Sequence, residues 1–249
     1  MYFVVRIENE QLMASTTNKW FNDNQEYLSE FVYGGIDGSI TTFAVVAGGV
    51  GANLDTSIIL IMGFANLLAD GLSMSIGAYL SAKSEKDNYE KHRAQEYWEV
   101  ENVPELEREE IRDIYRSKGF SGELLEQVVT VICSDEDCWV DTMMKEELEM
   151  IDTHKSAFSI GLVTFVSFII LGIIPLFIYV VELFVEINFS KLLFASSFTG
   201  LAFLLIGYLR GVVNEKHKIK SMLETLSMGA VAAFVAFYVG DFIEKLILS

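Results

Sequence analysis

The stretch that decides the fold is FVYGGIDGSITTFAVVAGG, from Phe31 to Gly49. It is apolar and rich in small residues, as a membrane-spanning helix is, yet Asp37 lies inside it. A charged side chain in hydrocarbon costs at least about 2.5 kcal/mol, and such acids usually mark ion sites or proton relays. The stretch therefore predicts a membrane span with a functional carboxylate. Two alternatives stay open: an acid hydrogen-bonded to a neighbouring helix, and one at the membrane surface.

The composition supports a membrane protein and excludes several function classes. Of 249 residues, 51% are hydrophobic, and the net charge of −17 makes a nucleic-acid partner unfavourable because phosphates need Lys and Arg. Cys133 and Cys138 are too few for a disulfide framework. There is no phosphate-binding glycine loop and no nucleophile motif, so we expect a protein that is not an enzyme.

Five stretches are long and apolar enough to cross the bilayer, which takes about 20 helical residues. They lie near residues 28–52, 57–82, 156–182, 192–210 and 224–243. Nothing breaks the helical pattern between Leu80 and Glu101, so the second span is expected to continue beyond the membrane as one rod.

Residues 83–155 differ sharply, with 21 Asp and Glu against 10 Lys and Arg. Apolar residues recur there at helical spacing, and Pro104 suits a helix start. The predicted fold is an all-α membrane protein with five transmembrane helices and a cytoplasmic helical metal-binding domain inserted between spans two and three. Its predicted parts are an N-terminal cytoplasmic segment (1–27), spans one and two (28–82), the insert (83–155) and spans three to five (156–249).

The distribution of cations predicts the orientation. No Lys or Arg occurs between Trp20 and Ala82, whereas the short loop after span four carries Arg210, Lys216, Lys218 and Lys220. By the positive-inside rule this loop, the N-terminus and the insert face the cytoplasm.

The first two spans hold candidate ligands. Asp70 and Met74 share a helix face, and a carboxylate with a thioether suits a borderline transition metal better than Mg²⁺ or Ca²⁺. Met74 alone would more simply be a packing residue. Gly34 and Gly38 predict a close helix partner near Asp37, as Gly207 and Gly211 do in span four; if that partner is the same span of a second subunit, two copies of Asp37 would face one pore.

The insert carries glutamates three residues apart, as in Glu96/Glu99 and Glu107/Glu110. Met143 and Met144 precede Glu147 by four and three residues, again on one face. Carboxylates converging from several helices can bind a divalent cation, although most acidic helix faces are simply solvated. Glu123 and Glu126 have the same spacing, so spacing alone does not choose among the pairs.

These residues resemble the vacuolar iron transporter family. GGIDGSITTFAVVAGG (34–49) and GFANLLADGLSMSIGAYLSAKSE (63–85) resemble its first two spans, and the insert, the span count and LLIGYLRG (204–211) agree. The resemblance implies a homodimer that moves Fe²⁺ out of the cytoplasm, into a vacuole-like store or out of the cell, in exchange for protons. It implies a pore between the first spans, with ligands Asp37 and Met74 and with Glu26 at the cytoplasmic mouth.

The resemblance also implies the ligands of the insert, namely Glu96, Glu99, Glu107, Glu110, Glu147, Met143 and Met144. Fe²⁺ is then a substrate and no prosthetic group is expected, while Zn²⁺, Co²⁺ or Mn²⁺ would also suit these ligands. A vacuolar-type or cell membrane is the expected location. Two alternatives stay open: a transporter of the same fold that prefers Mn²⁺, and a membrane-anchored metal sensor or buffer without flux.

Overall fold

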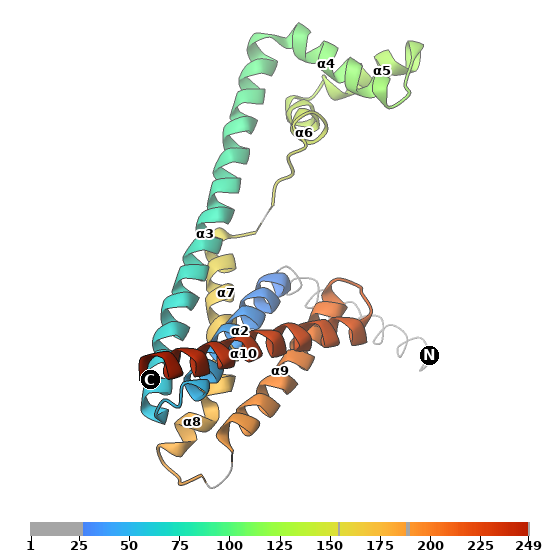
Figure 1. The fold of residues 1–249 in the computed structure, drawn as a ribbon. Coiled ribbons are helices and arrows are strands. Elements are labelled where there is room, and N and C mark those ends of the chain that lie inside the picture. Colours follow the sequence, from blue (N-terminus) through green and yellow to red (C-terminus); the bar gives the residue numbers. More distant parts are fainter. Residues whose placement is uncertain (1–26, 154, 188–189, 249) are drawn as a thin grey trace, which may run out of the picture. The chain divides into compact units, whose positions relative to one another are not determined.

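The computed structural model describes residues 27–153, 155–187 and 190–248 and is helical throughout, with no strand in these ranges (Figure 1). The chain divides into two compact units. The first unit combines Met1–Tyr79 with Ser156–Ser249, and the second is Leu80–Lys155.

The first unit contains the apolar helices. They are α2 (Leu28–Gly51), the first part of α3 (Thr56–Asn102), α7 (Ala157–Gly172), the 3₁₀ turn η1 (Ile174–Leu176), α8 (Phe177–Glu182), α9 (Lys191–Val213) and α10 (Lys218–Leu248). Five described helical stretches are long and apolar enough to cross a membrane, the third being Ala157–Glu182, which confirms the five predicted spans. Pro175 interrupts that third stretch, because its ring lacks a backbone N–H for the helix ladder.

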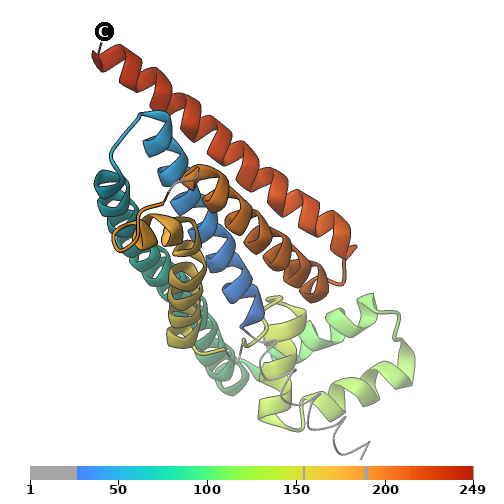
Figure 2. The same ribbon diagram turned by 90° about the horizontal axis from the view of Figure 1, so that it is seen from below.

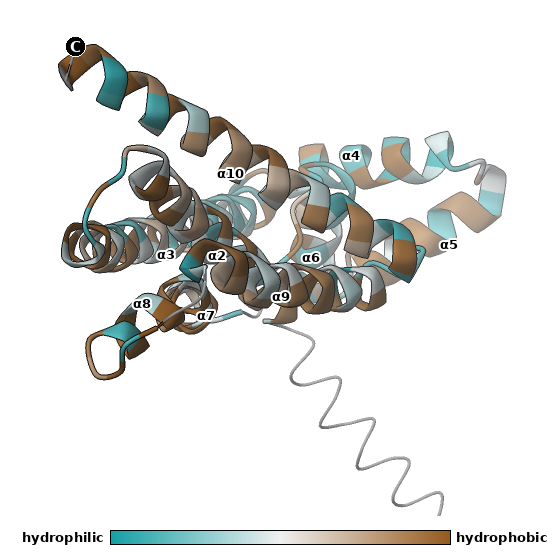
Figure 3. Cartoon of the chain, turned by 60° about the horizontal axis from the view of Figure 1, so that its bottom comes forward, coloured by the Kyte–Doolittle hydropathy of each residue, from teal (hydrophilic) through white to brown (hydrophobic). Residues whose placement is uncertain are grey.

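Large apolar side chains cover the outside of this unit. Leu201 on α9 and Phe234 on α10 are each 63% exposed, and Ile61 on α3 is 70% exposed. Figure 3 shows the same pattern as brown segments along α9 and α10. Soluble proteins rarely expose contiguous apolar faces of this extent, so the faces suit contact with lipid.

Helix α2 packs against α7, α9 and α10 of the same chain (Figure 2). A Cβ atom added at Gly34 would lie 2.6 Å from the carbonyl oxygen of Thr164, and one at Gly38 would lie 2.4 Å from that of Phe168. The two glycines therefore allow the close helix approach that the sequence predicted. Their partner is α7 of the same chain, so they are not what would join two subunits.

A pair of glycine variants tests this crossing. Gly38→Ala should lower the free energy of unfolding by about 1–3 kcal/mol, because the new methyl group meets the rigid backbone of α7. Gly77→Ala is the matched control, since a Cβ atom there has nothing within 4 Å and alanine favours the helix. Thermal unfolding of the purified chain in detergent measures both. Equal midpoints for the two variants would contradict the crossing.

The second unit consists of the rest of α3 with α4 (Pro104–Ser117), α5 (Gly122–Ile132) and α6 (Glu136–Glu146). Helix α3 runs unbroken from Thr56 to Asn102, which confirms the predicted absence of a break between Leu80 and Glu101. Pro104 is the first residue of α4, as predicted, and Gly119 with φ +96° follows that helix in a conformation that suits glycine. The core holds Val100, Ile111, Leu125, Val129, Ile132, Trp139, Val140, Met143 and Met144.

Candidate metal site and transport pathway

Three glutamates meet where α3 turns into α4. Helix α3 ends at Asn102, and α4 begins at Pro104 directly after the turn at Val103. One carboxylate oxygen from each of Glu96, Glu99 and Glu107 lies within 4.8 Å of the other two. Oxygen ligands of one divalent ion lie about 2.0–2.6 Å from it, so small side-chain shifts would allow all three to share a cation. We call these three residues the carboxylate cluster.

Two members of the carboxylate cluster are buried, each with one oxygen that is unpaired among the described residues. Glu96 is 4% exposed and Glu107 is 2% exposed. Among the described residues, the Oε2 atoms of both lack a hydrogen-bond donor, and neither carboxylate has Lys or Arg within 4.0 Å. Burying an ionised carboxylate is costly unless it is paired or binds a metal. The cluster therefore favours either a bound cation or a bound proton.

The surroundings of Glu96 and Glu107 favour the protonated form of both side chains. Burial, followed by the like charges of Glu147, Glu99 and Glu110, raises the pKa of Glu96 to about 7. Burial likewise raises the pKa of Glu107 to about 7, with Glu110 as its most influential neighbour. Burial followed by like charges also raises the pKa values of Glu110 and Glu147. All five predicted glutamates thus lie in one electrostatic neighbourhood.

The two predicted methionine ligands are buried side chains of the second unit. Met143 is fully buried and Met144 is 1% exposed, and both belong to the apolar core of the second unit. Glu147 follows them as the exposed C-cap of α6. A thioether in an apolar core contributes packing. A ligand role for the two methionines therefore stays a prediction, whereas the glutamates converge in the structure itself.

Polar contacts hold α6, which carries Glu147, against α3. An Nη atom of Arg93 lies 3.0 Å from Asp141, and the hydroxyl of Tyr97 donates a hydrogen bond to Asp137. Arg93 and Tyr97 lie on the same stretch of α3 as Glu96. These contacts thus fix the position of Glu147 relative to the carboxylate cluster.

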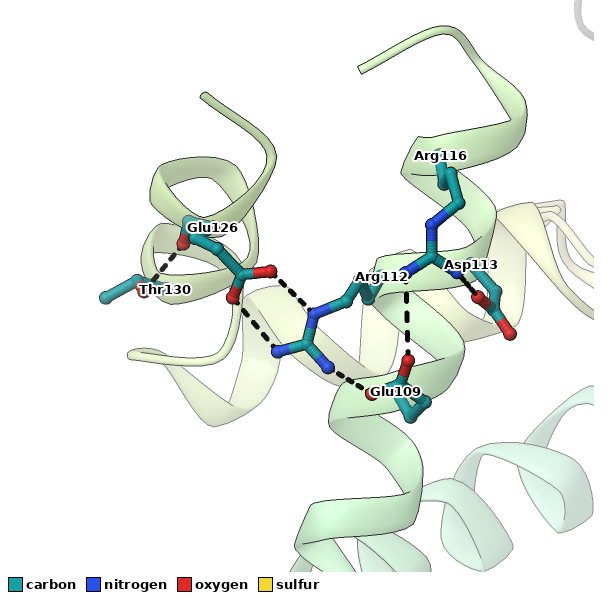
Figure 4. A network of polar contacts seen from close by, with 6 residues as sticks. All are labelled: Glu109, Arg112, Asp113, Arg116, Glu126 and Thr130. Atoms are coloured by element: carbon teal, nitrogen blue, oxygen red, sulfur yellow. Dashed lines mark hydrogen bonds and ion pairs between the residues drawn. The ribbon is translucent and has the colours of Figure 1, made fainter. Parts of the chain in front are cut away.

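Glu126 differs from the glutamates of the carboxylate cluster because arginine binds it, as Figure 4 shows. Arg112 binds the Glu126 carboxylate with two hydrogen bonds of 2.8 and 3.0 Å, and Arg112 also pairs with Glu109. The Arg112 hydrogen bond lowers the pKa of Glu126. Glu126 is therefore neutralised by a cation of the protein, which distinguishes it from Glu96 and Glu107. Spacing in the sequence did not reveal this difference.

The raised pKa values predict how pH affects the metal-free protein. An acid whose pKa rises on folding binds more protons in the folded state between its two pKa values, so stability falls as pH rises through that window. With an ordinary value of 4.5 and a folded value of about 7 for Glu96 and Glu107, the second unit should lose stability between about pH 4.5 and 7. Metal affinity should rise over the same window, because binding needs ionised carboxylates.

Thermal unfolding of the full chain in a chelator measures this stability through tryptophan fluorescence, to which Trp139 in the core of the second unit contributes. The double variant Glu96→Gln with Glu107→Gln should flatten the pH dependence. A metal-free stability that stays constant across the window would contradict the prediction.

In the first unit, Asp37 lies on a partly exposed face of α2. It follows Leu28, the first residue of α2, by nine positions, or about 14 Å along the helix axis at 1.5 Å per residue. The hydroxyl of Thr41, one turn further on, donates a hydrogen bond of 2.9 Å to the Asp37 carbonyl oxygen. We call the partly exposed residues at this helical spacing the open stripe: Tyr33, Asp37, Thr41 and Ala44.

Helix α3 brings a second acid near Asp37. Asp70 lies one turn before Met74, and its carboxylate is an electrostatic neighbour of Asp37. Both Met74 and Asp70 are half-buried. The sequence indicated the shared face of Asp70 and Met74 but not the proximity of Asp70 to Asp37. Glu26, the predicted ligand at the pathway mouth, lies outside the described residues.

Fold and site together define a class: an integral membrane protein of five apolar helical stretches with a carboxylate-rich helical unit between the second and third. The family model described as the VIT family matches residues 28–241. The chain belongs to the VIT family.

Three relatives show how far the similarity extends. The chain is 36% identical to a vacuolar iron transporter of Toxoplasma gondii (strain ATCC 50861 / VEG) over 91% of this chain and 77% of that protein. It is 33% identical to vacuolar iron transporter 1 of Eucalyptus grandis over 85% of this chain and 84% of the relative. The corresponding protein of Arabidopsis thaliana is 31% identical over 95% and 94% of the two chains.

Proposed function

We propose that this protein transports Fe²⁺ out of the cytoplasm, into a vacuole-like store or out of the cell, in exchange for protons. The relatives that match most of the chain are named vacuolar iron transporters. The observation that carries the proposal is the carboxylate cluster, with its buried oxygens unpaired among the described residues, in a chain with five candidate spans. Carboxylate oxygens, together with methionine thioethers that lie nearby in the sequence, suit a divalent ion of the first transition row.

The carboxylate cluster would collect the ion. Glu96, Glu99 and Glu107 offer three oxygens close together, and Glu110 and Glu147 add negative charge around them. Because these groups hold protons near neutral pH, an arriving Fe²⁺ displaces protons from them. The cluster would therefore bind the ion near neutral pH and more weakly at acidic pH.

The open stripe of α2 would carry the ion across the membrane. It is the side of α2 that α7, α9 and α10 leave partly uncovered, so two subunits meeting there would place two copies of Asp37 in one pore. Met74 would add a thioether from α3, and Glu26 would receive the ion at the cytoplasmic mouth. Protons and metal compete for the same carboxylate, which couples their opposite movements.

A flux assay tests the proposal. The full chain is reconstituted into liposomes with an acidic interior, and uptake of Fe²⁺, Mn²⁺ and Zn²⁺ is compared with and without the pH gradient. We expect Fe²⁺ uptake that the gradient accelerates. Higher uptake of Mn²⁺ would instead identify a manganese transporter, and metal binding without uptake would identify a sensor or buffer.

A further inference from the structure

The end of α9, the turn after it and the start of α10 carry four cations within eleven residues: Arg210, Lys216, Lys218 and Lys220. This density is unusual in a chain with a net charge of −17. The turn joins the ends of two candidate membrane spans, Lys191–Val213 and Lys218–Ile247. It therefore lies where hydrocarbon gives way to headgroups and water. We call these four residues the basic corner.

The helices at the basic corner approach very closely. A Cβ atom added at Gly207 would lie 2.6 Å from the Cα atom of Met222, and one at Gly211 would lie 2.9 Å from that of Lys218. Glu215 turns the chain with φ +51°, and the backbone N–H of Lys216 donates to the carbonyl oxygen of Gly211. The tight turn concentrates the cations at one end of the helix pair.

Two of these cations are not neutralised. Glu224 lies 3.6 Å from Arg210 and 4.0 Å from Lys220, so it offsets part of their charge. Within residues 190–248, no carboxylate lies within 4.0 Å of Lys216 or Lys218, and both are exposed. The ammonium group of Lys218 lies 5.3 Å from the centre of the Tyr208 ring, which holds its stem against α9. The basic corner thus has a net positive charge that is open to solvent.

A shallow groove of about 650 Å³ begins at the basic corner. It is lined by His217, Ile219, Lys220, Leu223, Glu224 and Ser227. Ile219 and Leu223 are 63% and 58% exposed, so its walls present apolar surface beside the cations. Exposed apolar residues continue along α10 at Met228 and Val231. The groove therefore joins a cationic end to an apolar track along a membrane helix.

We propose that the basic corner binds the headgroup phosphate of an anionic phospholipid, whose acyl chains lie along α10. Clustered Lys and Arg at the end of a membrane helix attract anionic headgroups, and the apolar track suits the attached chains. A free phosphate ion would use only the cations and leave Ile219 and Leu223 exposed. In the orientation predicted from the sequence, the lipid belongs to the cytoplasmic leaflet.

A lipid titration tests the site. The delipidated full chain in dodecyl maltoside receives phosphatidylglycerol or phosphatidylcholine of the same chain length, and native mass spectrometry counts the bound lipids. We expect preferential binding of phosphatidylglycerol. The triple variant Lys216→Gln, Lys218→Gln and Lys220→Gln should weaken that binding by at least about tenfold and leave phosphatidylcholine unaffected. The matching Lys→Arg triple variant should retain it, because the charge is kept.

The control removes the same charge elsewhere. Lys86→Gln, Lys91→Gln and Lys145→Gln change three exposed lysines of the second unit and should not change lipid binding. Equal binding of the two lipids, or equal losses in both glutamine triples, would overturn the proposal. Inorganic phosphate that displaces phosphatidylglycerol at comparable concentration would also overturn it, because it would identify a site for the free anion.

Discussion

Replacing Asp37 by alanine should abolish Fe²⁺ uptake into proteoliposomes, lowering the initial rate by at least about 100-fold, since even outer-shell partners of a metal contribute 10–100-fold. Asp37 is the only carboxylate on the open stripe of α2, and the neighbouring Thr41 hydroxyl binds the Asp37 backbone, which alanine leaves in place. Uptake should therefore fail although the helix stays folded. Initial rates at several Fe²⁺ concentrations measure the effect.

Asp55→Ala is the matched control. Asp55 is exposed in the turn after α2, and its backbone carbonyl oxygen, which alanine keeps, accepts the hydrogen bonds that begin α3. It should transport at the rate of the unchanged protein. Undiminished uptake by Asp37→Ala, with the control also active, would remove Asp37 from the pathway.

The second large effect concerns the carboxylate cluster. The double variant Glu96→Gln with Glu107→Gln should bind Fe²⁺ at least about 100-fold more weakly, because it removes two ligand charges. At pH 8 in a chelator the same variant should unfold at a higher temperature than the unchanged protein, because two buried charges disappear. Anaerobic chelator competition and thermal unfolding measure the two quantities on the full chain.

The double variant Glu123→Gln with Glu126→Gln is a control that should change stability in the opposite direction. It has the same spacing, but Arg112 already neutralises Glu126 (Figure 4). Metal affinity should stay unchanged, and stability should fall slightly, because an exposed ion pair contributes little. If the two double variants weaken metal binding equally, the cluster is not the metal site.

Much of the fold could be predicted because membrane spans follow from length and apolarity. The five spans, the unbroken α3 and the helix start at Pro104 all agree with the structure. The helix that packs against Gly34 and Gly38 could not be predicted. A spacing of small residues indicates that another helix approaches closely, but it does not identify that helix. The structure assigns that partner to α7 of the same chain.

The candidate site was only partly predictable, because charge pairing depends on tertiary contacts. Glu96/Glu99 and Glu123/Glu126 have identical spacing, and only the position of Arg112 distinguishes them. Likewise, Met143 and Met144 share a face with Glu147 in the sequence, yet the structure buries them in the core. Burial and counter-charges come from packing between helices, which a linear pattern does not record.

The glycine crossing of α2 and α7 has a consequence for movement. Gly38 and Gly172 meet backbone to backbone, so neither helix can slide along the other by a small step without a clash. A conformational change that alters the exposure of Asp37 must then displace α2 and α7 together as one rigid body. The hinges of such a change would lie beyond this pair, in the turns that connect it to α3 and to η1.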